Sequence, residues 1–366
     1  MGTESKTVTF MAPDYEGRWA KLGRGELISP SDSVSAPNFA YYSPLVKAAD
    51  DYVHWAQTPT ERIYLGFPDI DKEMRGIAPS ELCMINGYSH SGKTLALLQI
   101  LVSNRDKRVV YFCPDEPRTL TLIKLACVQH GIDANNLEDR IASYDNEAIT
   151  LLRETATEHF PNLAVFDQTV SLVDMERALA ETCDAMGDPQ LIVIDYLDLI
   201  TGGGEDIPSK ANSVKAFGKR HNIPMIVLHQ SSRTAGADGR KMTISSGAYG
   251  GEQQATHIIG VRRKRFEIEG HIRDLQEKLD RATNTEKIME KIESLQYELR
   301  IHQDTLTLNL VKCKRPASKL LDDMDYVIEM GSGRLSRLES GVLPYKLETQ
   351  TPESTPQPYQ DALSDW

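Results

Sequence analysis

The chain has 366 residues, of which 40% are hydrophobic and 26% are charged, as in a soluble globular protein of one large or two ordinary domains. There is no apolar run of the ~18 residues that a membrane span needs, and the first residues lack the apolar stretch of a secretory signal. The net charge of −12 argues against a protein that coats nucleic acid by bulk charge. Five scattered cysteines without metal-ligand spacing favour the cytoplasm, or the host cytoplasm for a viral protein.

The first part of the chain predicts an arm followed by a helix. Residues 1 to about 40 are polar and rich in glycine, proline and serine. Residues 43–57, SPLVKAADDYVHWAQ, carry apolar side chains at roughly helical spacing. This helix is either a local packing element or a linker that docks on a neighbouring subunit.

A phosphate-binding loop is predicted at residues 87–94, where GYSHSGKT fits G-x-x-x-x-G-K-[ST]. Glycines let backbone N–H groups cradle phosphate oxygens, the lysine adds positive charge, and the threonine hydroxyl can ligate Mg²⁺. A chance match is expected in roughly 1 in 100 chains of this length, but the apolar strand before and helix after favour a true loop. We therefore predict ATP and Mg²⁺ as ligands, with nucleotide contacts from Gly87, Ser89, His90, Ser91, Gly92, Lys93, Thr94 and Leu95.

Three further strands are expected to bring catalytic groups to the same edge of a parallel sheet. RVVYFC at residues 108–113 is followed by Asp115 and Glu116, either of which could activate water. QLIVIDYLDLI at residues 190–200 reads as a buried strand that delivers Asp195 as a support for Mg²⁺. IPMIVLHQSSR at residues 223–233 ends in polar residues that include Gln230.

A helical hairpin is predicted at residues 266–300. Isoleucines and leucines recur there with spacing 4, 3, 4, once in each half, which indicates two short amphipathic helices packed antiparallel. The hairpin is an insertion between two sheet strands. It is either a projecting spacer or a contact for a subunit or partner.

The C-terminal part predicts an alternating strand, DTLTLNLVKCKRP at residues 304–316, which ends in a basic cluster. A β-hairpin should follow, turning on residues 331–333. Residues 341–366 are proline-rich with few apolar side chains, so we expect a disordered acidic tail.

The order of these segments resembles a RecA-like core, and several of them resemble DnaB-type hexameric replicative helicases. The resemblance covers about residues 60–340, and its most specific segments are LIVIDYLDLI, LHQSSR, GGEQQATHII and VKCKRP. It implies an α/β fold with a RecA-like P-loop NTPase core, a mainly parallel central sheet, the inserted helical hairpin and a C-terminal β-hairpin. It implies an N-terminal arm and linker helix over 1–58, an ATPase/helicase domain over 59–340 and a tail over 341–366.

The resemblance also implies roles for single residues. Lys93 and Thr94 would hold phosphate and Mg²⁺, Asp195 would support the metal, and Gln230 would sense the γ-phosphate. The family's catalytic glutamate falls on Asp115, with Glu116 beside it, and the choice between them stays open. Lys312 and Lys314 occupy the positions of a finger that acts on the neighbouring subunit's ATP. The second finger residue is normally arginine, so either Lys314 replaces it or Arg315 has taken over.

Contacts with single-stranded DNA follow from the same resemblance. The arginine expected before the Glu-Gln segment is absent, because SSGAYGG occupies its place. The residues expected near DNA are Arg233, Arg240, Lys241, Gly251, Glu252 and Gln253.

The implied function is an ATP-driven helicase that forms a hexameric ring and translocates on single-stranded DNA during replication. Candidate partners are a loader, a primase and a polymerase, with no membrane. The family's N-terminal primase-binding domain is missing, as expected for the virus and phage type. The alternatives are a RecA-like recombinase or filament-forming ATPase without unwinding activity, and a nucleotide-gated scaffold.

Overall fold

The computed structural model describes residues 45–168, 171–231, 241, 251–279 and 285–338. The chain falls into two units, residues 1–61 and 62–366. In the first, the predicted helix is present as α2 (Leu45–Gln57), followed by the 3₁₀ turn η2 (Pro59–Glu61). None of the α2 residues is buried. The predicted arm over residues 1 to about 40 and the predicted tail lie outside the described residues.

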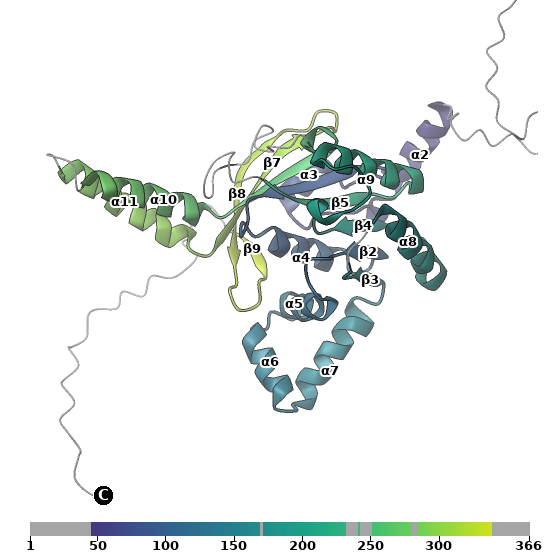
Figure 1. Ribbon diagram of the computed structural model, residues 1–366, viewed down its shortest axis with the longest axis horizontal. Coiled ribbons are helices and arrows are strands. Elements are labelled where there is room, and N and C mark those ends of the chain that lie inside the picture. Colours follow the sequence, from purple (N-terminus) through teal and green to yellow (C-terminus); the bar gives the residue numbers. More distant parts are fainter. Residues whose placement is uncertain (1–44, 169–170, 232–240, 242–250, 280–284, 339–366) are drawn as a thin grey trace, which may run out of the picture. The chain divides into compact units, whose positions relative to one another are not determined.

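The second unit is built on one nine-stranded sheet, in the order β3-β2-β4-β5-β1-β6-β7-β8-β9 (Figure 1). The strands from β3 to β6 in this order are parallel, and β7, β8 and β9 are antiparallel additions. The mainly parallel sheet and the C-terminal β-hairpin (β8–β9) are therefore confirmed. The strands are β1 (Leu82–Gly87), β2 (Val109–Phe112), β3 (Leu163–Phe166), β4 (Leu191–Ile194), β5 (Met225–Gln230), β6 (His257–Arg262), β7 (Thr305–Cys313), β8 (Leu321–Ile328) and β9 (Leu335–Arg337).

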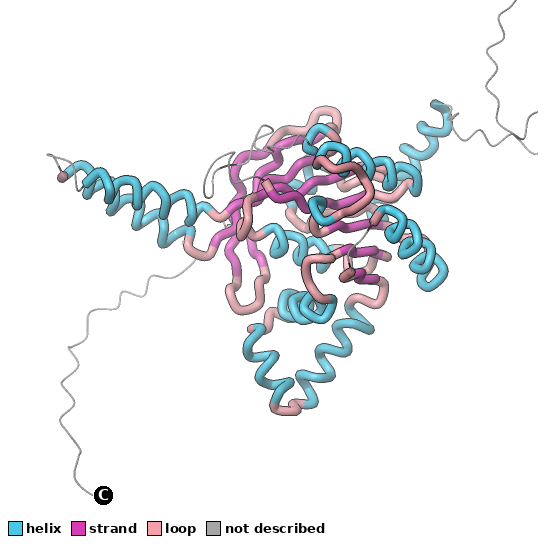
Figure 2. The backbone as a smooth tube through the Cα atoms, in the orientation of Figure 1, coloured by secondary structure: helices cyan, strands magenta, loops and turns pink. Residues whose placement is uncertain are grey.

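Helices cover both faces of this sheet (Figure 2). Helices α3, α4 and α5 contribute to a core on one face, and α8 and α9 to a core on the other. The helices and turns are α3 (Pro68–Met74), α4 (Lys93–Ser103), α5 (Arg118–His130), α6 (Ala134–Ala142), α7 (Asn146–Glu154), η3 (Thr155–His159), α8 (Leu172–Met186), η4 (Leu197–Leu199), α9 (Ile207–His221), η6 (Gly251–Gln253), α10 (Lys264–Leu279) and α11 (Glu286–His302). In the described part of the chain, no helix is long and apolar enough to span a membrane.

Strand β4 is shorter than the sequence predicts. It ends at Ile194, and the apolar residues after Asp195 form the 3₁₀ turn η4 instead of continuing to Ile200. The four β4 residues are all buried, and Leu197 of the turn is buried in the core on the α8 and α9 side. This apolar run is therefore divided between a strand and a 3₁₀ turn, and both contribute side chains to the core on the α8 and α9 side.

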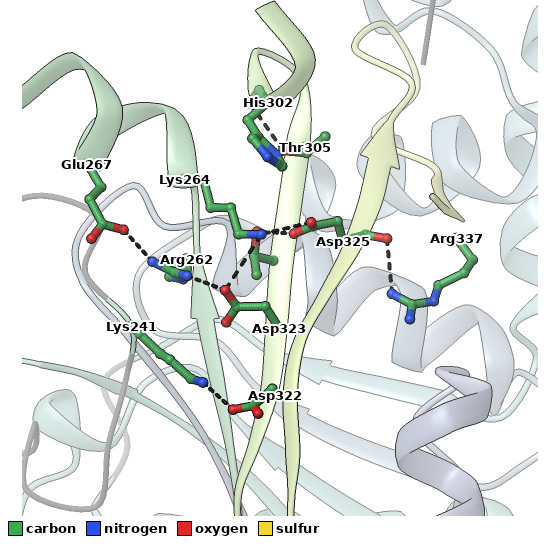
Figure 3. Close-up of polar contacts among 11 residues, drawn as sticks. Lys241, Arg262, Lys264, Glu267, His302, Thr305, Asp322, Asp323, Asp325 and Arg337 are labelled. Atoms are coloured by element: carbon green, nitrogen blue, oxygen red, sulfur yellow. Dashed lines mark hydrogen bonds and ion pairs between the residues drawn. The ribbon is translucent and has the colours of Figure 1, made fainter. Parts of the chain in front are cut away.

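The inserted hairpin is confirmed as α10 and α11, which bury Ile268, Ile272, Ile292 and Leu295 against one another. Charged side chains join the start of the hairpin to strands of the sheet, as Figure 3 shows. Arg262 pairs with both Glu267 and Asp323, while the ammonium of Lys264 lies 2.8 Å from a carboxylate oxygen of Asp325. The apolar cluster between α10 and α11 contains residues of the hairpin alone, but the first turn of α10 is joined to β6 and β8 by ion pairs.

Deletion of residues 267–300, with a short turn joining the ends, should leave the second unit folded. The hairpin's apolar cluster contains only residues of α10 and α11, so its loss should expose little of the two main cores. Thermal unfolding followed by circular dichroism should remain cooperative. Insoluble protein, or a broad non-cooperative transition, would show that the hairpin belongs to the core.

Candidate functional site

The phosphate-binding loop connects β1 to α4, as its spacing predicts. Gly92 has φ of 93°, where an L side chain is strained, and a Cβ there would lie 2.4 Å from Cδ1 of Leu306. The buried Lys93 ammonium donates to the carbonyl oxygens of Gly87 and Tyr88, at 2.9 and 2.7 Å. Burial lowers the pKa of Lys93 to about 8, against the opposing effect of Asp195 and Asp198.

Asp195 follows β4 beside this loop and is 7% exposed. The Tyr111 hydroxyl on the neighbouring strand β2 donates to its carboxylate at 3.2 Å. Burial raises the pKa of Asp195 to about 6, with Tyr111 opposing the shift. A buried carboxylate kept from full ionisation by desolvation is well placed to accept a cation. Below about pH 6, a proton would compete with that cation.

The residues present fit Mg²⁺ bound together with phosphates. Within the described ranges, no group of three or more His, Cys, Asp or Glu side chains could hold a metal ion. Mg²⁺ needs no such cage, because one or two carboxylates and the substrate's phosphates complete its shell. Asp195 and the Thr94 hydroxyl, next to Lys93, would supply the hard oxygen ligands.

The two acidic candidates after β2 lie in different surroundings. Glu116 accepts from the Thr121 hydroxyl at 3.1 Å and pairs with the Lys124 ammonium, so both of its oxygens are held against α5. Asp115 is exposed and accepts only a long bond, 3.4 Å, from the Tyr196 hydroxyl among the contacts described. Both carboxylates lie close enough to influence the pKa of Asp195.

Gln230 ends β5 and lies directly opposite Gly87 in the parallel register, so it borders the phosphate loop. Its neighbour His229 is fully buried, with Nδ1 3.4 Å from a carboxylate oxygen of Asp198. The amide N–H of Ser231 donates to the Gly87 carbonyl at 3.1 Å. The end of β5 is thus joined to the first residue of the loop by the backbone.

The predicted DNA-contact residues are divided by the structure. Arg233 and Arg240 lie outside the described residues. Lys241 pairs with Asp322 of β8 (Figure 3), and Gln253 is exposed in η6. The other two, Gly251 and Glu252, are buried in η6.

Glu252 belongs to a buried hydrogen-bonded chain rather than to an open surface. Its carboxylate accepts from the Asn86 side-chain amide at 3.3 Å, and the Ser231 hydroxyl donates to the Asn86 carbonyl oxygen at 2.7 Å. Asn86 immediately precedes the phosphate loop. These hydrogen bonds therefore join three segments: β1, which leads into the loop, the residue after β5, and η6.

The three basic residues at the end of β7 also differ. Lys312 donates to the carbonyl oxygens of Glu252 and Gln253 at 3.0 and 3.3 Å. Arg315 forms two bonds of 2.7 Å to Glu81 and further bonds to the carbonyl oxygens of Met74 and Gly76.

Lys314 is exposed and pairs with no acidic side chain among the described residues. It lowers the pKa of nearby Lys312 and Lys215, in each case after the larger effect of burial.

Sequence reasoning missed several residues that organise the site. Tyr111 and Asn86 lie inside apolar strands. The one signal that could have found them is that each is a polar residue near the carboxyl end of a strand that leads into the site. Lys124 lies on α5 eight residues beyond Glu116, so only the turn between β2 and α5 brings the two together. No pattern in the sequence predicts the pairing of Glu81 with Arg315.

Comparisons with known proteins agree with this geometry. Solved structures that share the fold include an ATPase domain and a DnaB-like replicative helicase. One is an ATPase domain on its own, with a TM-score of 0.60 at 16% identity, and the match covers 81% of this chain and 100% of that one. The other is a DnaB-like replicative helicase, solved for its interactions with primase, with a TM-score of 0.58 at 15% identity, covering 89% and 74%.

Curated relatives include the replicative DNA helicase DnaB of Geobacillus stearothermophilus, 26% identical over 46% of this chain and 39% of that protein. DnaB of Treponema pallidum is 26% identical over 65% of this chain and 58% of that protein. The chain thus spans about half the length of these relatives. Residues 63–293, more than half of the chain, match the family described as DnaB-like helicase C terminal domain, and the chain belongs to that family.

Proposed function

We propose that this chain is the motor of a replicative DNA helicase, a ring of identical subunits that hydrolyses ATP with Mg²⁺ and moves on single-stranded DNA. Its relatives are replicative helicases, which does not favour the filament alternative. One observation carries the proposal: the loop at residues 87–94 and the exposed Lys314 lie at opposite ends of the strands of the same sheet.

The register of the strands gives this separation. Cys313 at the end of β7 pairs with His257 at the start of β6, and His257 pairs with Cys83 near the start of β1. The phosphate loop follows Gly87, at the other end of β1. At about 3.3 Å per residue, the basic end lies more than about 12 Å from the loop of its own chain.

Lys314 therefore completes a site on another subunit. Arg315 is engaged by Glu81 and two carbonyl oxygens of its own chain, so it anchors the strand end. Lys312 holds η6 in place, because its ammonium donates to the carbonyl oxygens of Glu252 and Gln253. Of the three, Lys314 is the residue whose ammonium is exposed, and it would meet charge on a neighbour's γ-phosphate.

In the subunit that binds ATP, each group has a distinct task. Lys93 and the loop amides hold the phosphates, Asp195 and Thr94 hold the metal, and Gln230 contacts the γ-phosphate. Bound Mg²⁺ would neutralise developing charge on the phosphates. Asp115 acts as the base for water, because Glu116 is already neutralised by Lys124.

Separate variants at the acidic pair test this assignment. Asp115→Asn should lower ATP turnover by roughly 100-fold or more while nucleotide binding persists, the scale of a positioned base. Glu116→Gln, which removes the pairing with Lys124, serves as the matched variant and should have the smaller effect. The measurements are steady-state hydrolysis and nucleotide affinity. A reversed order would assign the base to Glu116, and equal mild effects would place it elsewhere.

DNA contact belongs to the segments between Arg233 and Gln253. We propose that Lys241 exchanges Asp322 for a DNA phosphate, and that Gln253 faces the strand from η6. The buried hydrogen bonds among Asn86, Ser231 and Glu252 would couple a change in the conformation of the phosphate loop to these segments. A few cationic contacts per subunit, summed around a ring, let an acidic chain bind DNA.

Association of subunits has a second support in α2. This helix exposes Leu45, Val46, Tyr52 and Val53, at 86, 69, 58 and 49%. Such a face is suited to burial against a neighbour.

The expected replication partners are a loader, a primase and a polymerase, and the expected location is the cytoplasm. Both the partners and the location stay predictions.

Electron microscopy with a non-hydrolysable ATP analogue and a forked DNA tests the proposal. Closed six-membered rings encircling one strand are the expected particles. Open filaments along the DNA would support the recombinase alternative, and monomers at micromolar protein concentration would contradict both.

A further inference from the structure

The lysines at the end of β7 face the side of the sheet that α8 and α9 cover. The register of β7 against β6 shifts by one residue beside Lys312, which pairs with Ile258, a residue of the core on that side. Cys313, the next residue, packs against the core on the other side. Because residues paired across a sheet share a face and successive residues alternate, Lys312 and Lys314 are both directed toward α9.

Helix α9 brings a third lysine to the same place. The turn η6 packs on α9, since a Cβ on Gly251 would lie 3.6 Å from Cβ of Ala211, and Lys312 donates to the carbonyl oxygens of the two residues after Gly251. Lys215 lies one turn beyond Ala211, toward the start of β5, and Lys314 lies beyond Lys312, toward the starts of β6 and β1. These strand starts are neighbours in the sheet, so Lys215 and Lys314 converge.

The charges of these lysines act on one another. Burial lowers the pKa of the partly buried Lys215, and the nearby Lys314 adds to the shift. The pKa of Lys312 is lowered by burial and then by Lys314 and Lys215. Over the described ranges, neither Lys215 nor Lys314 pairs with an acidic side chain. Ammonium groups gathered in this way repel one another in the isolated subunit, and a surface of one sign attracts an ion of the opposite sign.

A pair of lysines can do what one lysine cannot. The resemblance implies an arginine at the position of Lys314, and a guanidinium would offer two parallel N–H donors to a phosphate. The single ammonium of Lys314 is a point charge on a flexible stem. Two ammonium groups supplied by different elements of the fold can instead contact two oxygens of one phosphate.

We propose that Lys215 and Lys314 together form the finger of this chain and contact two non-bridging oxygens of the γ-phosphate held by the neighbouring subunit. The inference rests on the proposed function, in which Lys314 acts on another subunit's ATP, and it adds a residue of α9 to that site. The two charges stabilise the negative charge that develops on the γ-phosphate during transfer, so they act on turnover more than on binding of ATP.

Steady-state hydrolysis by the full chain, with saturating single-stranded DNA, tests whether the two lysines act together. Lys215→Ala should lower kcat by about tenfold or more while KM for Mg-ATP stays within about twofold of the wild-type value. Lys314→Arg supplies the two-pronged donor, so Lys215→Ala in that background should lower kcat by less than about twofold. The matched control is Lys219→Ala, which removes an exposed lysine one turn farther along α9 and should leave kcat unchanged.

Three results would overturn the inference. An unchanged kcat in Lys215→Ala would remove this lysine from the site, and an equal loss in both backgrounds would show that it acts apart from Lys314. Unchanged hydrolysis at saturating DNA, with a DNA affinity that depends less on salt, would assign Lys215 to a DNA phosphate. If Lys215→Ala lowers the melting temperature, Lys215→Met, which keeps the stem and removes the charge, decides the question by the same comparison.

Failure of this inference can be distinguished from failure of the proposed function. Mixed subunits carrying Lys314→Ala or Asp195→Asn should recover hydrolysis if Lys314 acts on a neighbour. No recovery would reject the finger as a whole. Recovery in that mixture, together with normal kcat in Lys215→Ala, would reject the role of Lys215 alone.

Discussion

We expect Lys93→Ala to abolish ATP hydrolysis. The Lys93 ammonium is the fixed positive charge at the mouth of the loop, held 2.9 and 2.7 Å from the carbonyl oxygens of Gly87 and Tyr88. Without it, the loop has no other lysine or arginine to balance the charge of the β- and γ-phosphates. We expect turnover to fall to background with and without single-stranded DNA, while far-ultraviolet circular dichroism stays unchanged.

A matched control for this variant is Lys72→Ala, which removes an exposed lysine from α3. Its hydrolysis should equal that of the wild type. Near-normal turnover in Lys93→Ala would contradict the assignment of residues 87–94 as the phosphate loop. Loss of the circular dichroism signal would instead require a second variant, Lys93→Met, which preserves the stem's packing.

Lys314→Ala should reduce hydrolysis by up to ~10³-fold while nucleotide binding persists, because a finger stabilises charge that develops only during transfer. Arg315→Ala should behave differently. Arg315 binds Glu81, which directly precedes β1, so its loss should lower the melting temperature as well as activity. The control is Lys319→Ala, an exposed lysine a few residues farther along.

Mixing variants tests whether Lys314 acts on another subunit. Subunits with Lys314→Ala keep an intact phosphate site, and subunits with Asp195→Asn keep an intact finger. In a mixed ring, some interfaces combine both intact halves, so hydrolysis should reappear although each variant alone is inactive. No recovery at any ratio would show that Lys314 does not act in trans. If Lys314→Ala makes DNA affinity less dependent on salt concentration, Lys314 instead contacts a DNA phosphate.

The sequence was most informative where local patterns carry the structure. The loop at residues 87–94, the alternating strand β7 and the two apolar stripes of α10 and α11 each follow from spacing within one element. The gathering of Asp195 and Gln230 beside the loop followed too, because parallel strands bring their carboxyl ends together. The end of β4 was misjudged because periodicity cannot distinguish a buried strand from a buried turn.

Contacts between distant segments could not be predicted in this way. Glu252 reads as a residue near DNA, yet the structure buries it against Asn86, 166 residues away. Arg315 reads as part of the finger, yet Glu81, 234 residues away, holds it. In both cases the partner depends on which strands become neighbours in the sheet, and one sequence contains no direct record of that order.

Strand displacement from a forked duplex tests the central claim most directly. Wild-type protein should release the labelled strand only with hydrolysable ATP and Mg²⁺, and only when the fork offers a single-stranded arm for loading. Lys93→Ala protein should release none under the same conditions. Hydrolysis stimulated by single-stranded DNA without any strand release, at every salt concentration and arm length, would contradict a helicase and leave a DNA-dependent ATPase that does not unwind.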